Sequence, residues 1–164
     1  MTGLIAVPIA PAAPVELAAD GWFPPIGLAR IRACLPIGGG GGSITNEQLQ
    51  FAIEGGMLTA LAALSEWRSA HAAAGVASLA DLPSPVLAGR KASLVLWERA
   101  VAYYACADLV AVNVDITATD AGLNREEEKA SKADEFRRLG HAAIADLRSI
   151  GAARPIPRNM VRLL

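Results

Sequence analysis

The stretch TNEQLQFAIEGGMLTALAALSEWRSAHAAAG, Thr45 to Gly75, predicts one long helix with both of its ends marked. Thr45 can cap the first turn, and Gln48 three residues later completes a capping-box pattern. Gly75 suits the left-handed position that follows the last residue of a helix. Apolar residues recur between these ends every three or four positions, which places on one helical face Leu49, Ile53, Met57, Ala60, Leu64 and Trp67.

The pair Gly55–Gly56 interrupts this helix and lowers its intrinsic stability by about 1 kcal/mol per glycine relative to alanine. Such a pair is tolerated where a neighbouring helix passes very close or where the helix bends. We therefore expect either a close neighbouring helix or a bend at residues 55–56.

Three further helices are predicted around this one, at about residues 27–35, 90–112 and 124–150. Pro36 ends the first of them and Gly151 the last, and Pro83 and Pro85 forbid helix in the connector before residue 90. The inner face of the third is expected to carry Leu94, Trp97, Val101, Tyr104, Leu109 and Val112. That of the fourth is expected to carry Ala133, Phe136, Gly140, Ala143, Leu147 and Ile150.

The composition favours an all-α fold. Of the 164 residues, 53% are apolar, only 5% are aromatic and 34 are alanine, the best helix former. We expect a small bundle of three long helices and one short helix, built on small aliphatic side chains. Proline positions divide the chain into an extended arm (1–25), a helical adaptor domain (26–151) and an extended docking tail (152–164).

The charge and the cysteines limit the class of protein. A net charge of −1 gives no overall attraction to nucleic acid or to anionic lipid. Cys34 and Cys106 are not in a CxxC pair, which fits a reduced compartment better than a disulfide scaffold. The N-terminus lacks the basic residues of a signal peptide, and no apolar run reaches 18 residues. We expect a soluble, non-exported protein with no membrane partner.

The run Gly38–Gly42 before the long helix raises the possibility of a phosphate-binding loop. A P-loop follows a strand and continues into Lys and Ser or Thr, whereas here no Lys follows Gly42 and no strand pattern precedes Gly38. A dinucleotide fingerprint would need a βαβ unit. The run is interpreted as a flexible hinge between two helices.

No pattern of catalytic or metal-binding residues stands out, and we expect no enzyme activity, metal or cofactor. His71 and His141 lack the spacing of a metal pair, and they are interpreted as a helix-end cation and an edge residue. The acidic segment Glu126–Glu128 is interpreted as a solvated helix face, with a face toward another subunit or toward DNA as the alternative.

The C-terminal segment combines basic and apolar residues, which is unlike the composition of a disordered end. Such a segment suits insertion into a groove of a partner protein, although an idle terminus is the alternative. Together with an aromatic anchor at Trp22 and Phe23, the predicted partner-docking residues are Arg154, Pro155, Ile156, Arg158, Met160, Val161, Arg162, Leu163 and Leu164.

Over residues 20–155 the sequence resembles the head completion (L-type) proteins of temperate tailed phages of the peduovirus group. The shared blocks, in order, are GWFP, GMLTALAALSEWR, LADLP, LWERAVAYYACADL and the ARP after Gly151, of which LWERAV is the most specific. The glycine run and the REEEK segment have no counterpart in that pattern.

The resemblance implies a structural virion protein that is added after DNA packaging and stabilises the filled head. It implies a ring, with twelve subunits in similar adaptors, on the portal protein. The partners would be the portal, neighbouring copies, and a tail-side connector or terminator protein, near the packaged DNA. The expected location is the head–tail interface of the virion, after assembly in the host cytoplasm. Such adaptors dock on the portal through a C-terminal segment, which corresponds here to residues 153–164.

Two other classes of function are weighed. A DNA-binding packaging factor, similar to a terminase small subunit, would need a helix-turn-helix, but the junctions at 35–43 and 76–90 are too rich in glycine or proline for its short turn. A small helical enzyme would need a ligand-sized pocket with convergent polar groups.

Overall fold

The computed structural model describes residues 15–34, 44–112, 120–152 and 155–158, with the side chains of residue 112 and residues 120–129 left undescribed. Its helices are α1 (Leu28–Cys34), α2 (Asn46–Ala73), α3 (Ala92–Val112) and α4 (Asp120–Arg148), with a short 3-10 turn, η1 (Leu79–Asp81). Two antiparallel ribbons are made by β1 (Glu16–Leu17) with β2 (Ile26–Gly27) and by β3 (Val86–Leu87) with β4 (Arg90–Lys91). The prediction of an all-α protein is confirmed.

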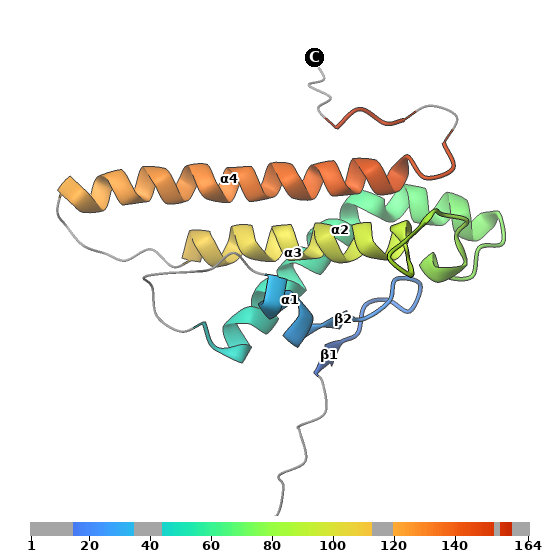
Figure 1. Cartoon of the computed structure of the whole chain (residues 1–164), viewed down its shortest axis with the longest axis horizontal. Coiled ribbons are helices and arrows are strands. Elements are labelled where there is room, and N and C mark those ends of the chain that lie inside the picture. Colours follow the sequence, from blue (N-terminus) through green and yellow to red (C-terminus); the bar gives the residue numbers. More distant parts are fainter. Residues whose placement is uncertain (1–14, 35–43, 113–119, 153–154, 159–164) are drawn as a thin grey trace, which may run out of the picture.

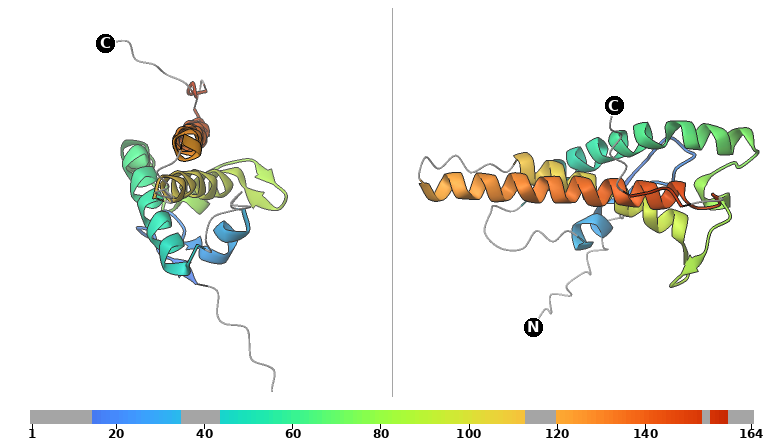
Figure 2. Two further views of the ribbon diagram at one scale, coloured as in Figure 1. Left: turned by 90° about the vertical axis from the view of Figure 1, so that its left-hand side faces the viewer. Right: turned by 90° about the horizontal axis from the view of Figure 1, so that it is seen from above.

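Helix α3 is the centre of the arrangement. Helix α4 runs antiparallel along one side of α3, while α2 crosses obliquely on another side (Figure 1). The two views in Figure 2 place α2 and the β3–β4 ribbon on opposite sides of α3. The core lies where α2, α4 and the N-terminal ribbon pack on α3, and Trp97, Val101 and Ala105 of α3 are completely buried.

The long helix predicted first is present with its predicted cap. The Thr45 backbone N–H donates to Gln48 Oε1 at 3.0 Å, and the Gln48 backbone N–H donates to Thr45 Oγ1 at 3.2 Å. Gly75 follows the helix with a φ of +90°, in the left-handed region. The predicted inner face is confirmed too: Trp67 is half-buried, and the other five side chains are buried.

Of the two explanations for the glycine pair, a close neighbouring helix applies at Gly56. A β-carbon added there would lie 2.7 Å from the carbonyl oxygen of Val101 and 3.1 Å from the backbone nitrogen of Ala105, both in α3. Gly140 of α4 makes a second approach, where a β-carbon would lie 2.7 Å from the Tyr104 ring. Glycine at these two positions lets α2 and α4 pack directly against α3.

The predicted boundaries of the last two helices need correction. Residues 90 and 91 belong to β4 and pair with β3, so α3 begins at Ala92. The ribbon turns through Ala88 and Gly89, whose φ values of +48° and +77° are those that a two-residue hairpin requires. Helix α4 begins at Asp120, before the predicted start at residue 124. The predicted inner faces of the third and fourth helices are confirmed wherever side chains are described: Leu94 and Ile150 are half-buried, and the other residues are buried.

The described part of the predicted N-terminal arm is not a free arm. Residues 15–27 form the β1–β2 ribbon, and the turn between its strands carries Trp22 and Phe23 into the core. The ribbon continues directly into α1, where the Leu28 backbone N–H donates to the Val15 carbonyl oxygen at 3.0 Å. This segment therefore folds with the helices, although its prolines had indicated an independent extended chain.

Candidate docking site

The aromatic pair that was expected to anchor a partner faces inward. Trp22 and Phe23 are 6% and 1% exposed. The Phe23 ring stacks on Trp97 with centroids 4.4 Å apart, and Trp22 meets Trp67 edge to face at 5.9 Å. The Trp22 Nε1–H donates to the carbonyl oxygen of Val76 at 3.0 Å. These side chains join the N-terminal ribbon to α2 and α3. We therefore exclude them from the proposed docking surface.

Asp20 holds the turn that directs the two rings inward. Its Oδ1 accepts hydrogen bonds from the backbone N–H groups of Trp22 at 3.1 Å and Phe23 at 3.0 Å. Its Oδ2 lies 2.9 Å from Nη1 of Arg68 in α2. The sequence contained a signal for this, because an aspartate commonly opens a turn by accepting a hydrogen bond from the backbone N–H two residues further on.

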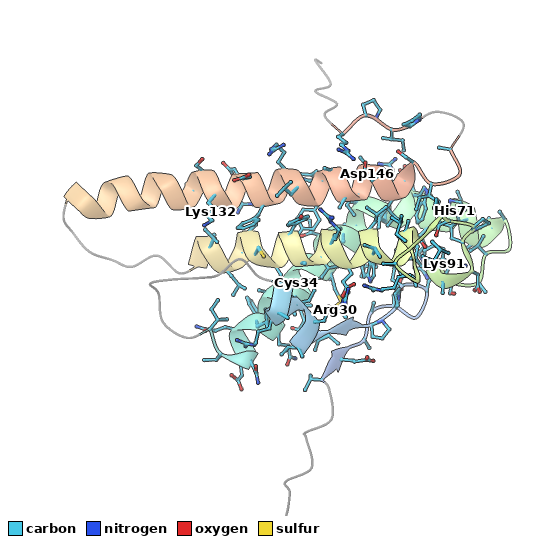
Figure 3. The ribbon with its side chains drawn as sticks, viewed as in Figure 1. Arg30, Cys34, His71, Lys91, Lys132 and Asp146 are labelled. Atoms are coloured by element: carbon cyan, nitrogen blue, oxygen red, sulfur yellow. The ribbon has the colours of Figure 1, made fainter. Side chains whose placement is uncertain are left out.

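The described part of the C-terminal tail lies against the end of α4. The backbone N–H of Ile156 donates to Ser149 Oγ at 2.8 Å, and Ile156 is half-buried. Arg158 makes a two-pronged pair with Asp146, with Nε–Oδ1 and Nη2–Oδ2 distances of 2.8 and 2.9 Å. This hydrogen bond raises the pKa of Arg158 above its usual value. Asp146 lies on α4 where the tail passes over it (Figure 3).

Of the other predicted docking residues, Pro155 is exposed beside Ile156. The remaining ones lie outside the described residues, and their docking role stays a prediction: Arg154, Met160, Val161, Arg162, Leu163 and Leu164. The Gly38–Gly42 hinge also lies outside the described residues, as do the side chains of Val112 and of Glu126–Glu128.

The structure exposes several large apolar side chains that the sequence did not single out. Phe51 and Leu58 of α2 are 77% and 70% exposed, and Val86 and Leu87 of the β3–β4 ribbon are 63% and 62% exposed. Phe51 and Leu58 are seven residues apart and therefore lie on one face of α2, away from the buried stripe. A helix with apolar residues on a second face was the signal that could have revealed them.

A shallow cleft of about 370 Å³ lies between the N-terminal ribbon and the start of α3. Glu98, in its wall, accepts from Arg90 Nη2 at 2.7 Å and pairs with Arg30 of α1. The two guanidinium groups share the Glu98 carboxylate across the cleft, whose wall also contains Glu16. These ion pairs tie α1 and β4 to α3.

Several buried polar groups belong to the packing of the helices. Burial raises the pKa of the Tyr104 hydroxyl to about 12 and that of the Cys106 thiol to about 12. Tyr104 Oη lies 3.0 Å from His141 Nδ1, at the notch made by Gly140. Within the described ranges, no cluster of three or more His, Cys, Asp and Glu side chains could hold a metal ion. None of the helices in that part of the chain has the length and hydropathy of a membrane span.

Comparison with known protein families matches residues 17–159 to the phage head completion protein (GPL) family. The chain belongs to the phage head completion protein (GPL) family. The match runs from β1 to just past the Arg158–Asp146 pair, so it includes both the N-terminal ribbon and the described tail. No curated protein and no solved structure matches the chain.

A head completion protein has a structural role in the phage head and acts with other head and tail proteins of the virion. Its exposed apolar side chains and its tail are therefore considered as surfaces for protein contacts. Among the described residues of this head completion protein, they lie in four places: Val15 before β1, the outer face of α2, the β3–β4 ribbon, and the segment after α4.

Proposed function

We propose that this head completion protein assembles as a ring on the portal of the DNA-filled head and joins the head to a tail-side connector or terminator protein. The observation that carries the proposal is the family match over residues 17–159. A twelve-subunit ring follows the resemblance to adaptors of this kind. The protein would act at the head–tail interface, close to packaged DNA, with no reaction and no cofactor of its own.

The C-terminal tail is proposed as the segment that binds the portal. In support, the tail leaves α4 as a non-helical chain. Its described part is held by two hydrogen bonds from the Ala152 and Ile156 backbone N–H groups to Ser149 and by one largely exposed ion pair. An exposed pair of this kind stabilises a fold only weakly, so a partner surface can replace it at little cost. Arg158 and Ile156 would then contact the portal in place of α4.

The ring is proposed to form on the portal and not in free solution. Subunits held side by side on a symmetric template meet at a high effective concentration, which makes weak contacts between them sufficient. A closed ring also requires each subunit to present two different faces to its two neighbours.

The portal contact is tested by pulling down portal protein with the full chain and with a chain that ends at Gly151. We expect the full chain to retain portal and the shortened chain to lose most of the binding. Thermal unfolding of both proteins serves as the control for folding. Equal retention by two folded proteins would show that the tail is not the docking segment.

The same two proteins distinguish the proposal from a role as a DNA-binding packaging factor. A gel shift on duplex DNA at physiological salt is expected to show no tight complex, because the chain has a net charge of −1. Tight, salt-dependent binding would favour the packaging factor.

A further inference from the structure

We propose that neighbouring subunits of the ring contact each other through two surfaces, with the β3–β4 hairpin of one copy packed on the outer face of α2 of the next. The hairpin surface consists of Val86 and Leu87, with Arg90 and Lys91 at its base, and the α2 surface of Glu47, Phe51, Glu54 and Leu58. The inference rests on the proposed ring and names its subunit interface.

The first step is the exposure of apolar side chains. The structure exposes five large apolar side chains in the described residues, and four of them fall into two pairs, Phe51 with Leu58 and Val86 with Leu87. Each pair leaves most of its surface in water, with exposed fractions between 62% and 77%. Val86 and Leu87 are consecutive residues of β3 and point to opposite faces of the ribbon, so each face of the hairpin presents one apolar side chain. Large exposed apolar side chains gathered in this way mark sites of protein contact.

The second step is the position of the two surfaces. The α2 helix and the hairpin lie on opposite sides of α3 in both views of Figure 2. A head-to-tail ring needs two different complementary surfaces on different sides of each subunit, whereas a two-fold dimer needs only one that matches itself. The arrangement therefore fits a second copy of this chain placed head to tail.

The third step is charge. Positions 47, 51, 54 and 58 follow the three- and four-residue spacing of one helical face, so Glu47 and Glu54 flank the two apolar residues. Residues 33–67 contain no Lys or Arg. The base of the hairpin holds Arg90 and Lys91, with Arg30 of α1 beside them. The acidic side chains there are Glu98, which pairs with both arginines, and Asp81 of η1, so three cations outnumber two carboxylates. One surface is thus apolar and acidic and the other apolar and basic, so opposite charges meet when one copy packs on the next.

The fourth step is the rigidity of the hairpin. Lys91 Nζ donates to the carbonyl oxygens of Ala80 and Leu82, and Arg90 pairs with Glu98. The Ala92 backbone N–H donates to the Pro85 carbonyl oxygen at 2.7 Å. The base of the hairpin is therefore fixed to η1 and α3, and the exposed Val86 and Leu87 need little further ordering when they bind.

The test is cross-linking between engineered cysteines in assembled heads. Cys34, which is exposed, is first replaced (Cys34→Ser), whereas Cys106 is buried and can remain. Leu58→Cys and Leu87→Cys are then introduced singly and together, and heads assembled with each protein are treated with a short thiol cross-linker. We expect the double variant to give a ladder of oligomers and each single variant to give monomer alone, because position 58 of one copy meets position 87 of the next.

The matched control pairs Leu87→Cys with Ala63→Cys, an exposed α2 position that lies about 140° around the helix from Leu58. We expect no ladder from this pair. Heads that contain the protein but give no 58–87 product, or dimers formed by a single variant, would overturn the interface while leaving the ring possible. Absence of the unmodified chain from the heads would instead overturn the proposed function and the interface with it.

Discussion

The two adjacent glycines of α2 meet different surroundings, although the sequence presents them as one pair. A β-carbon on Gly56 would meet the backbone of α3, which cannot move aside without shifting the helix. A β-carbon on Gly55 would lie 2.9 Å from Asp108 Oδ2, the end of a side chain that can rotate away. Their positions in the packing, and not their residue type, should therefore determine the effect of replacing each.

We predict that Gly56→Ala destabilises the protein by about 1–3 kcal/mol, as overpacking a close helix contact does. Gly55→Ala is the matched control and should range from neutral to a gain of about 1 kcal/mol, because alanine favours the helix. Urea unfolding measures both changes. Equal effects at the two positions would contradict the close approach at Gly56.

Cys106 predicts a dependence of stability on alkaline pH. Burial raises its pKa from 9.0 to about 12, so the folded protein keeps a proton that the unfolded chain loses. The contribution is complete below pH 9 and decreases as the pH rises from 9 toward 12, by at most about 1.4 kcal/mol per pH unit. In a Cys34→Ala background, the additional change Cys106→Ala should reduce the slope of unfolding free energy against pH above 9. Parallel slopes for the two proteins would refute the shift.

At the scale of elements, the N-terminal ribbon is the part whose role changed most between sequence and structure. Its prolines indicated an extended arm, yet its turn places Trp22 and Phe23 among Trp67 and Trp97. The contacts join residues more than forty positions apart in the chain. Local sequence rules do not describe such long-range packing.

We predict that Phe23→Ala costs about 3–5 kcal/mol of stability, because it removes a buried ring from the core. Val15→Ala in the same segment should change stability by less than about 0.5 kcal/mol, since Val15 is 53% exposed. Thermal or urea unfolding measures the difference. A small effect of Phe23→Ala would mean that the ribbon is a dispensable arm after all.

The long helices were predictable because their signals are local and repeated. The capping box at Thr45 and Gln48 and the apolar stripe from Leu49 to Trp67 fix the first helix within its own sequence. The β3–β4 hairpin was missed, because strands of two residues have no measurable alternation and Ala88 is not a residue that usually indicates a left-handed turn. The start of α3 was misplaced for the same reason.

At the scale of the whole molecule, the sequence indicated the family but not the surfaces. The order of the shared blocks pointed to head completion proteins, and the family match agrees. The exposed groups at Phe51, Leu58, Val86 and Leu87 become visible only when the buried face of each element is known. The exposure of a side chain depends on which elements pack together. The sequence alone did not show how the hairpin packs against the helices.

We predict that the purified chain is a monomer in the absence of portal. Each proposed contact surface is small, with two apolar side chains on either side, so association should need the portal as a template. Sedimentation at increasing protein concentration, with and without portal, tests this. A stable ring formed by the chain alone would refute the templated assembly.

The glycine contacts on α3 also have a consequence for axial register. Helices α2 and α4 each pack on α3, and each has one site without a side chain at its closest approach, Gly56 and Gly140. If either helix slid by one turn along α3, a residue with a β-carbon would take the place of the glycine and collide with the Val101 carbonyl or the Tyr104 ring. The position of α2 and of α4 along the axis of α3 is thereby fixed. A force along the bundle should therefore tilt or displace the whole subunit before its helices slide past each other.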